Sequence, residues 1–339
     1  MEPHVAERGG SACQALPEKL PDREVFEPLV DIGALSTTLS ESMVNSMSAL
    51  VTMRSALVVG ILTCASFPGT ANAQAALQSE KFSFKVVDAF ERGAAVSGEL
   101  RIPDSKTGRL PAVLILHSSP GFDGRGAFYA EALNQAGIAT VEIDYIQGKG
   151  MPATPRHNLP HAYQTLQYLA AHPRIDPMRI GVMGFSWGGI LAVLTSSEAL
   201  SRQYAGGKLR FAAHLGLYPI CWRHRTVLAG TFKVFKPTVY HRVTGRPVHI
   251  LAGDKDGYDD PDSCEKFLAD LPGEVRPHFS LTVYPGATFG WDSRFSSASY
   301  DAGARKGKGG IVTVTANPHI ANQSREFAVT FFRKHLAAD

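Results

Sequence analysis

The sequence predicts an α/β fold in which helices cover both faces of a mostly parallel central sheet. Two observations predict it. Short apolar segments of strand type alternate with helical segments over most of the chain. The segment 112–116, Ala-Val-Leu-Ile-Leu, is an uninterrupted apolar run, which is typical of a strand buried on both faces. Because no internal repeat or low-complexity tract interrupts the alternation, we expect one domain.

The expected elements can be placed along the chain from their apolar patterns. Two antiparallel strands come first, at 82–90 and 95–102, joined by a turn near 92–93. The later strands are expected at 112–116, 139–143, 180–183, 212–217, 248–251 and 280–284. Helices are expected at 127–136, 159–171, 187–197, 261–271 and 320–336.

Composition and charge exclude several classes of protein. Of the 339 residues, 44% are hydrophobic and 19% are charged, which fits a packed globular protein and excludes a disordered chain or a coiled coil. The formal net charge is only +3, and the nearest thing to a basic run is a short loop with Arg305, Lys306 and Lys308. Nucleic acid is therefore not an expected partner. No CxxC or HExxH pairing occurs, so we expect no metal site.

Residues 53–73 have the pattern of a secretory signal peptide. Met53 and Arg54 supply the positive start, an apolar run follows, and Ala71-Asn72-Ala73 is a small-x-small cleavage site before Gln74. The apolar run is shorter than the ~20 residues of a membrane-spanning helix, so we expect no integral span in the mature chain. The expected location is periplasmic or secreted.

Residues 1–52 are mixed and aperiodic, and we expect them to be a non-structural upstream extension, with translation starting at Met53. The folded domain would then be 74–339. In that mature chain only Cys221 and Cys264 remain. Disulfides persist outside the cytosol, so we expect a bridge between them rather than two separate buried thiols. Closing a loop of roughly 40 residues would contribute about 3–4 kcal/mol.

Ser186 is the candidate nucleophile. It is the centre of Gly-Phe-Ser-Trp-Gly at 184–188, between a strand and the apolar helical segment 190–194. A G-x-S-x-G sequence in this context forms a sharp strand-to-helix turn, and its small residues let the turn close. The serine hydroxyl then stands at a helix N-terminus, which favours developing negative charge. The alternative is an ordinary glycine-rich turn.

A pair of carboxylates follows the strand expected at 248–251, at the end of the sheet where sites of α/β proteins lie. The run is Gly-Asp-Lys-Asp, and its Gly-x-x-Asp spacing selects Asp256 as the acid of the site. Asp254 would be solvated or cap a backbone group. Asp259 and Asp260 are expected to cap the helix that follows.

Two backbone N–H groups are candidates for an oxyanion hole. One belongs to Trp187, directly after the candidate nucleophile. The other would come from the loop of Ser118 and Ser119, at the end of the buried strand 112–116. His117 in that loop is expected to be structural rather than a base.

Together these segments resemble the dienelactone hydrolase family of α/β-hydrolases, over roughly residues 82–336. The segments that carry the resemblance are Leu116-His117, Asp123-Gly124-Arg125-Gly126, Gly184-Phe185-Ser186-Trp187-Gly188-Gly189, Tyr218-Pro219-Ile220-Cys221-Trp222, Gly253-Asp254-Lys255-Asp256 and Tyr284-Pro285-Gly286-Ala287-Thr288. The resemblance implies an α/β-hydrolase fold and a serine esterase that hydrolyses a small ester or lactone through an acyl-enzyme, without a cofactor. Ser186 and Asp256 match the nucleophile and the acid of the family.

The base of the family is missing. After Tyr-Pro-Gly-Ala-Thr the family places its catalytic histidine, and here Phe289 occupies that position. A phenyl ring cannot accept the proton of Ser186. In subtilisin, loss of the triad histidine lowers kcat by about 10⁶-fold.

Three explanations for Phe289 stay open at this point. Phe289 is an introduced or erroneous change in an otherwise working hydrolase, or another histidine acts as the base, or the protein binds a ligand in the ancestral pocket without hydrolysing it. Among the histidines, His319, which lies after the last strand, is the first choice for a substitute base, and the alternative is that it is simply an exposed residue after Pro318. His224 is a weaker candidate.

Overall fold

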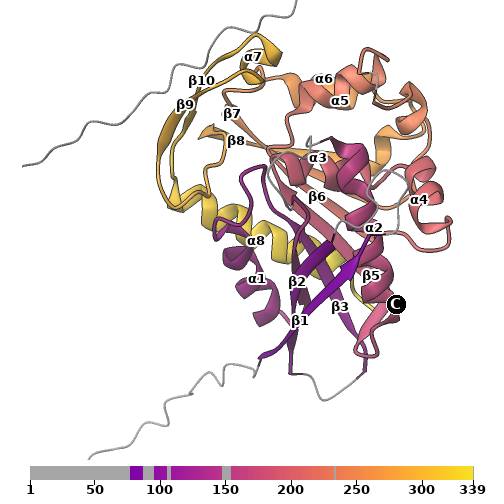
Figure 1. The fold of residues 1–339 in the computed structure, drawn as a ribbon. Helices are drawn as coiled ribbons and strands as arrows, with labels where there is room; N and C mark the ends of the chain where they lie inside the picture. Colours follow the sequence, from indigo (N-terminus) through magenta and orange to yellow (C-terminus); the bar gives the residue numbers. More distant parts are fainter. Residues whose placement is uncertain (1–76, 87–94, 105–107, 147–153, 233, 339) are drawn as a thin grey trace, which may run out of the picture. The chain divides into compact units, whose positions relative to one another are not determined.

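A central sheet of eight strands dominates the computed structural model, which describes residues 77–86, 95–104, 108–146, 154–232 and 234–338 (Figure 1). The expected extension at 1–52, the expected signal peptide at 53–73 and the expected turn at 92–93 lie outside these described residues.

The strand order in the sheet is β1-β2-β4-β3-β5-β6-β7-β8. The six strands β4, β3, β5, β6, β7 and β8 are mutually parallel. At one edge of the sheet, β2 pairs antiparallel with β4, and β1 pairs antiparallel with β2. The fold class predicted from the sequence is therefore confirmed. The bounds are β1 Leu77–Lys85, β2 Ala95–Pro103, β3 Leu110–Leu116, β4 Ala139–Asp144, β5 Ile175–Phe185, β6 Ala213–Leu217, β7 Val248–Lys255 and β8 Phe279–Thr288.

Helices connect the strands, and a small hairpin stands apart from the sheet. The helices are α1 Arg125–Gln135, α2 Pro155–Ala171, α3 Trp187–Leu194, α4 Glu198–Ala205, α5 Cys221–Leu228, α6 Ser263–Asp270, α7 Ala304–Gly307 and α8 Pro318–His335, with 3-10 turns at Pro237–Tyr240 and Arg276–His278. The hairpin pairs β9 Ser297–Asp301 with β10 Gly310–Val314. The helices α4, α5 and α7 and this hairpin were not predicted from the sequence, because such short segments carry little periodicity. The equally short α3 and α6 were predicted because the Ser186 motif precedes one and Asp259-Asp260-Pro261 precedes the other. No helix in the described ranges combines the length and the apolar run that a bilayer crossing needs.

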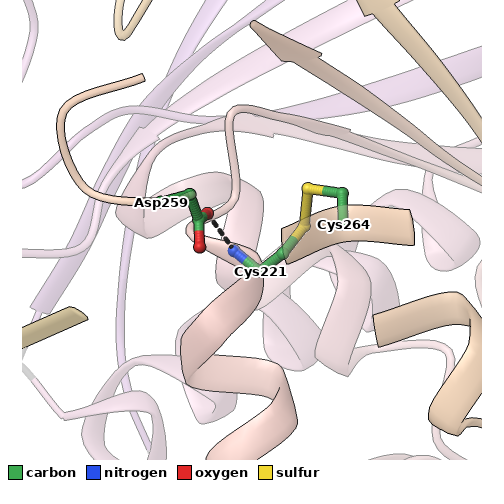
Figure 2. A group of neighbouring side chains, drawn as sticks. All are labelled: Cys221, Asp259 and Cys264. Carbon is green, nitrogen blue, oxygen red and sulfur yellow. Dashed lines mark hydrogen bonds between the residues drawn. A yellow bond between two sulfur atoms is a disulfide. The ribbon is translucent and has the colours of Figure 1, made fainter. Parts of the chain in front are cut away.

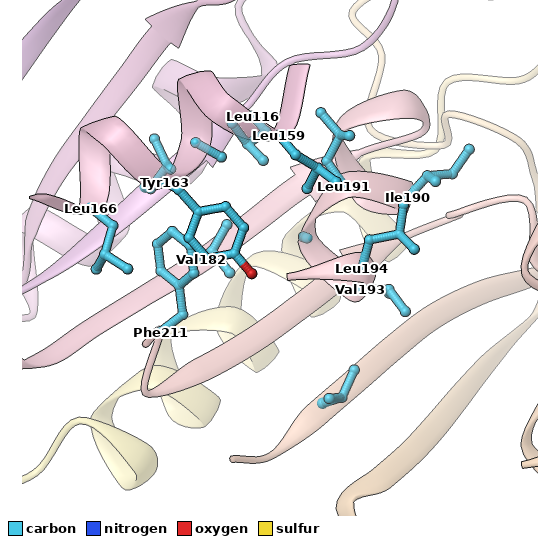
Figure 3. Close-up of a cluster of buried hydrophobic side chains, with 14 of the residues drawn as sticks. Leu116, Leu159, Tyr163, Leu166, Val182, Ile190, Leu191, Val193, Leu194 and Phe211 are labelled. Atoms are coloured by element: carbon cyan, nitrogen blue, oxygen red, sulfur yellow. The ribbon is translucent and has the colours of Figure 1, made fainter. Parts of the chain in front are cut away.

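Each face of the sheet has its own hydrophobic core. In β3, Leu114 and Leu116 belong to one cluster, whereas Val113 and Ile115 belong to the other, as expected for a strand buried on both faces. Figure 3 shows part of the first cluster, in which α2 and α3 side chains pack against Val182 of β5. The second cluster takes in side chains of α1 and α8. The two layers hold the strands in place, and so fix where each strand ends.

One predicted helix cap is wrong. Asp259 does not cap the helix that follows it but accepts hydrogen bonds from the backbone N–H groups of Cys221 at 2.6 Å and Trp222 at 2.9 Å, at the start of α5. Asp260 forms an ion pair with Lys306 instead. Spacing along the chain suggested the nearest helix, whereas the fold brings the start of a more distant helix to the carboxylate.

Candidate active site

Ser186 stands at the turn between β5 and α3, in a backbone conformation that few residues adopt. Its φ is 53° and its ψ is −112°, a strained combination for a residue with a side chain. Two hydrogen bonds hold the turn: the Ser186 N–H donates to the Leu217 carbonyl at 3.0 Å, and the Ile190 N–H donates to the Ser186 carbonyl at 2.8 Å. This is the strand-turn-helix geometry that the motif predicts.

The glycines of the motif are required by close backbone contacts. A Cβ on Gly184 would lie 2.3 Å from the carbonyl carbon of Gly188. A Cβ on Gly188 would lie 2.1 Å from the carbonyl oxygen of Leu116, at the end of β3. Both distances are too short for any side chain, so the turn can close only with glycine at these positions.

The turn after β3 lies beside the serine turn. The carbonyl of His117 is, like that of Leu116, within 2.6 Å of the position of a Cβ on Gly188. Ser118 is buried and its carbonyl accepts a hydrogen bond from Gly121 N–H at 3.0 Å, while Ser119 is exposed. The structure thus brings the Ser118–Ser119 turn and the start of α3 together, as an oxyanion hole with Trp187 requires.

Asp256 and Phe289 follow directly on two paired residues of neighbouring strands. Lys255, the last residue of β7, is paired with Thr288, the last residue of β8. Asp256 directly follows the first strand, and Phe289 directly follows the second. Asp256 accepts a hydrogen bond from the Tyr258 N–H at 2.8 Å. The register therefore places the candidate acid and the position of the missing histidine at the same end of the sheet.

Burial raises the pKa of Asp256 to about 8, and the nearby carboxylate of Asp259 adds to the rise. Hydrogen bonds from backbone N–H groups lower it only in part. The carboxyl group therefore holds its proton to a higher pH than an ordinary aspartate does. In a working triad the histidine accepts a proton and its positive charge stabilises the ionised acid. Phe289 offers Asp256 no such charge.

Phe289 is half-buried in an aromatic cluster. The centre of its ring lies 5.0 Å from that of Tyr218, which follows β6, and 4.6 Å from that of Tyr258, on the loop after β7. Both contacts are edge-to-face, a favourable arrangement for aromatic rings. The position of the expected base is thus filled by a well-packed side chain that has no proton-accepting atom.

Neither of the other candidate bases forms a hydrogen bond with Ser186 or Asp256 in the part of the chain that the structure describes. His319 is exposed in the first turn of α8, and within the described residues it forms no hydrogen bond with Ser186 or Asp256. His224 is buried, bonded through Nδ1 to the Tyr240 hydroxyl at 2.5 Å, and burial lowers its pKa to about 3. A histidine with so low a pKa is a poor proton acceptor.

His117 is the structural residue that the sequence predicts. It is buried, its Nδ1 lies 2.7 Å from the Ser118 carbonyl, and its ring stacks on Tyr145 with centres 4.2 Å apart. Burial lowers its pKa, so the imidazole is neutral at physiological pH.

A buried polar network around Arg125 was not predicted from the sequence. The guanidinium of Arg125 donates to the carboxylate of Asp123 at 2.8 Å, to the hydroxyl of Tyr218 at 2.8 Å and to the hydroxyl of Ser118 at 2.6 Å. The Tyr218 hydroxyl in turn donates to Asp292 at 2.5 Å. These residues link the turn after β3, the end of β6 and the loop after β8.

The charges in this network depend on one another. Burial by itself would lower the pKa of Arg125, but Tyr218, Asp123 and Asp292 together raise it above its ordinary value. Burial raises the pKa of Asp292, and Arg125 and the hydroxyl donors oppose that rise. The only sequence signal was the pairing of Arg125 with Asp123 two residues earlier, since Tyr218 and Asp292 lie far along the chain.

The expected disulfide between Cys221 and Cys264 is present and joins the start of α5 to α6 (Figure 2). Asp259 lies next to it, and one ligand atom of each of the three residues lies within 4.8 Å of the others. Such a group could suggest a metal ion, but both sulfur atoms are used in the disulfide and the carboxylate accepts two backbone hydrogen bonds. We therefore assign these three residues a structural role.

Two comparisons of the sequence with known proteins point to one family. A family model described as the dienelactone hydrolase family matches residues 141–309, which include Ser186, Asp256 and Phe289. A Bradyrhizobium protein named "Probable 2-oxo-3-(5-oxofuran-2-ylidene)propanoate lactonase" is 25% identical over 211 residues, covering 57% of this chain and 77% of that protein.

Solved structures share the fold. Esterase 2 of Thermogutta terrifontis, phosphorylated by paraoxon, superposes with a TM-score of 0.56 at 17% identity, over 77% of this chain and 96% of the esterase. Est1E from Butyrivibrio proteoclasticus superposes with a TM-score of 0.53 at 16% identity, over 76% of this chain and 99% of that one. At these identities the likeness concerns the fold alone.

Proposed function

Because the chain belongs to the dienelactone hydrolase family of the α/β-hydrolase superfamily, we propose that it is an exported serine hydrolase that cleaves a carboxylic ester or lactone through an acyl-enzyme on Ser186. The conformation of Ser186 carries this proposal. Strained backbone conformations cluster at functional sites, and this serine lies between two close-packed glycines, directly before a helix.

The reaction would begin with attack of the Ser186 hydroxyl oxygen on the substrate carbonyl. The N–H of Trp187 and an N–H of the Ser118–Ser119 turn would stabilise the negative oxygen of the tetrahedral intermediate. Collapse of that intermediate expels the alcohol, which takes up the proton lost from Ser186. Water then attacks the acyl-enzyme, so that the acid is released and the serine regains its proton.

Phe289 changes how fast these steps can go. Because the phenyl ring of Phe289 cannot accept the Ser186 proton, solvent would have to receive it. The oxyanion hole and substrate binding would still give a rate about 10³–10⁴-fold above that in water, as in serine proteases without their triad. We therefore propose slow turnover for the chain with Phe289.

A second function is favoured by the same cluster. Phe289 packs edge-to-face on Tyr218 and Tyr258, so the position of the expected base is apolar, and burial raises the pKa of Asp256 to about 8. A protein that binds a small apolar ligand in the ancestral pocket, without hydrolysing it, would have these properties.

Export is proposed from the signal pattern at 53–73. The disulfide between Cys221 and Cys264 supports it, since such bonds persist in oxidising compartments. N-terminal sequencing of the secreted or periplasmic protein should give Gln74 as the first residue, and an N-terminus before Gln74 would contradict the cleavage site.

Labelling of Ser186 by a fluorophosphonate tests the hydrolase proposal without a guess about substrate. The purified protein, Ser186→Ala and Phe289→His are each incubated with the probe and weighed by intact-mass spectrometry. Slow labelling of the native chain, absent in Ser186→Ala and much faster in Phe289→His, is the expected result. Fast stoichiometric labelling of the native chain would reveal a base elsewhere, and His319→Ala would then test His319. No labelling of either the native chain or Phe289→His would favour the binding protein.

A further inference from the structure

The β9–β10 hairpin is an insertion between β8 and α8 that does not join the central sheet (Figure 1). Its strands pair antiparallel, with Tyr300 opposite Ile311 and Ala298 opposite Thr313. Directly opposed residues of an antiparallel pair lie on the same face, and faces alternate along each strand. These four side chains therefore share one face, which we call the outer face.

The other face of the hairpin is fixed to the loop that carries Asp256. Val312 is buried against Gly257, where a Cβ would lie 3.3 Å from the Val312 Cα. The backbone N–H groups of Arg305 and Lys306 donate to the carbonyls of Gly257 and Tyr258, each at 3.0 Å. Since one face is held against the protein, the orientation of the outer face is determined.

The outer face is apolar and exposed. Tyr300 is 70% exposed and Ile311 is 56% exposed, and Phe295, two residues before β9, is 82% exposed. Of the six large hydrophobic side chains that are exposed in the described residues, Tyr300 and Ile311 lie on the outer face, and Phe295 precedes the hairpin in the chain. Ala298 and Thr313 add no charge. Isolated exposed apolar side chains are normal, but a concentration of them marks an interaction surface.

Basic residues outnumber acidic ones in the segment that contains this face. From 293 to 314 the chain has four basic residues and one acidic residue, Asp301, which is bonded to the Tyr258 hydroxyl at 2.8 Å. Lys306 is paired with Asp260. Within the described residues, no ion pair is formed by the other three basic side chains, which are all exposed: Arg294, Arg305 and Lys308.

We propose that the outer face of the β9–β10 hairpin docks on a lipid bilayer that carries anionic headgroups. Apolar and aromatic side chains at such a surface enter the boundary between headgroups and acyl chains, while neighbouring cations bind the headgroups. A second copy of this chain fits the surface less well, because it would bring the same set of cations to the contact. The proposal does not depend on whether Ser186 is active.

Co-sedimentation of the purified protein with vesicles tests the proposal. Vesicles of phosphatidylcholine with phosphatidylglycerol should bind the protein, and vesicles of phosphatidylcholine alone should bind it weakly. Binding should weaken as salt is raised, because salt screens the charge attraction. No binding to the anionic vesicles at low salt, or equal binding to both compositions, would overturn the proposal.

Two double variants separate the apolar and the charged contributions. Tyr300→Ser with Ile311→Ser should lower the affinity about tenfold, because both side chains lose their burial in the interface. Arg305→Gln with Lys308→Gln should lower it about fivefold for each charge removed. All four side chains are exposed, so circular dichroism should show an unchanged fold.

Matched controls come from exposed positions elsewhere on the chain. Met178→Ser removes an apolar side chain that is 63% exposed, and Lys208→Gln removes an exposed charge. Neither should change vesicle binding. Loss of binding in the controls equal to that in the double variants would overturn the assignment of this face. Loss of a dimer rather than of vesicle binding in Tyr300→Ser with Ile311→Ser would show that a second copy occupies it.

Discussion

Asp256 and Phe289 extend from two residues, Lys255 and Thr288, that face each other across β7 and β8. The candidate acid and Phe289 therefore lie at the same end of two neighbouring strands. The consequence is electrostatic as well as chemical, since burial without a compensating cation raises the pKa of Asp256 to about 8. The phenyl ring at position 289 can supply neither a proton acceptor nor a positive charge to this carboxyl group.

Phe289→His should raise the rate of ester hydrolysis by several orders of magnitude. Loss of a triad histidine costs about 10⁶-fold in subtilisin, and imperfect placement of the new imidazole between Tyr218 and Tyr258 will recover part of that. Hydrolysis of p-nitrophenyl acetate measures the effect. The control is Ser186→Ala with Phe289→His, which should remain inactive; activity in this double variant would place the reaction elsewhere.

Asp256→Asn should stabilise the protein above pH 8. A carboxyl group whose folded pKa is raised to about 8 favours folding most when protonated, and this contribution is lost as pH rises from about 4 through 8. The amide stays neutral, keeps the hydrogen bond from the Tyr258 N–H, and should be more stable at high pH by a few kcal/mol.

Urea unfolding at pH 5 and at pH 9 measures this difference, with Asp254→Asn as the matched change two residues away. The stability gain of Asp256→Asn should grow between the two pH values. A gain of equal size at both would mean that ionisation of Asp256 is not its cause.

Arg125→Met should destabilise the fold by about 3–5 kcal/mol, because it leaves Asp292 buried without its cation. Adding Asp292→Asn to Arg125→Met should restore part of that loss, since the buried negative charge is removed as well. A double-mutant cycle followed by urea unfolding gives the coupling. Additivity within about 0.5 kcal/mol would show that the two groups act independently.

Gly188→Ala should destabilise the protein and slow fluorophosphonate labelling of Ser186. The new methyl group meets the Leu116 carbonyl oxygen at 2.1 Å, so the turn after β3 or the serine turn must shift. Gly273→Ala is the control, because no atom lies within 4 Å of its Cβ position. Normal stability and labelling in Gly188→Ala would mean that the two turns are less tightly packed than the structure indicates.

Replacing both Cys221 and Cys264 by serine should lower the free energy of unfolding by about 3–4 kcal/mol, because the bridge closes a loop with a sequence separation of 43. Thermal and urea unfolding of this double variant and of the native protein measure the loss. Alkylation of the native protein, unfolded but unreduced, should leave both cysteines unlabelled, and labelling of either would contradict the bridge.

The sequence alone was sufficient for the features that neighbouring residues specify. The apolar run at 112–116 predicted a strand buried on both faces, and β3 divides its side chains between the two cores in that way. The Gly-Phe-Ser-Trp-Gly motif predicted the turn at Ser186, because Gly184 and Gly188 approach each other within five residues of chain. The roles of Ser186 and Asp256 as nucleophile and acid stay predictions for the labelling experiment.

Contacts between distant segments could not be predicted in the same way. Asp259 caps α5 rather than the helix next to it, Tyr218 joins Arg125 to Asp292, and the hairpin folds back on Gly257. Local patterns of burial and turn chemistry depend on a few successive residues, and the sequence contains them in full. Which strand ends meet depends on sheet order and register, and these arise only when the whole chain packs, so the tertiary structure alone decided them.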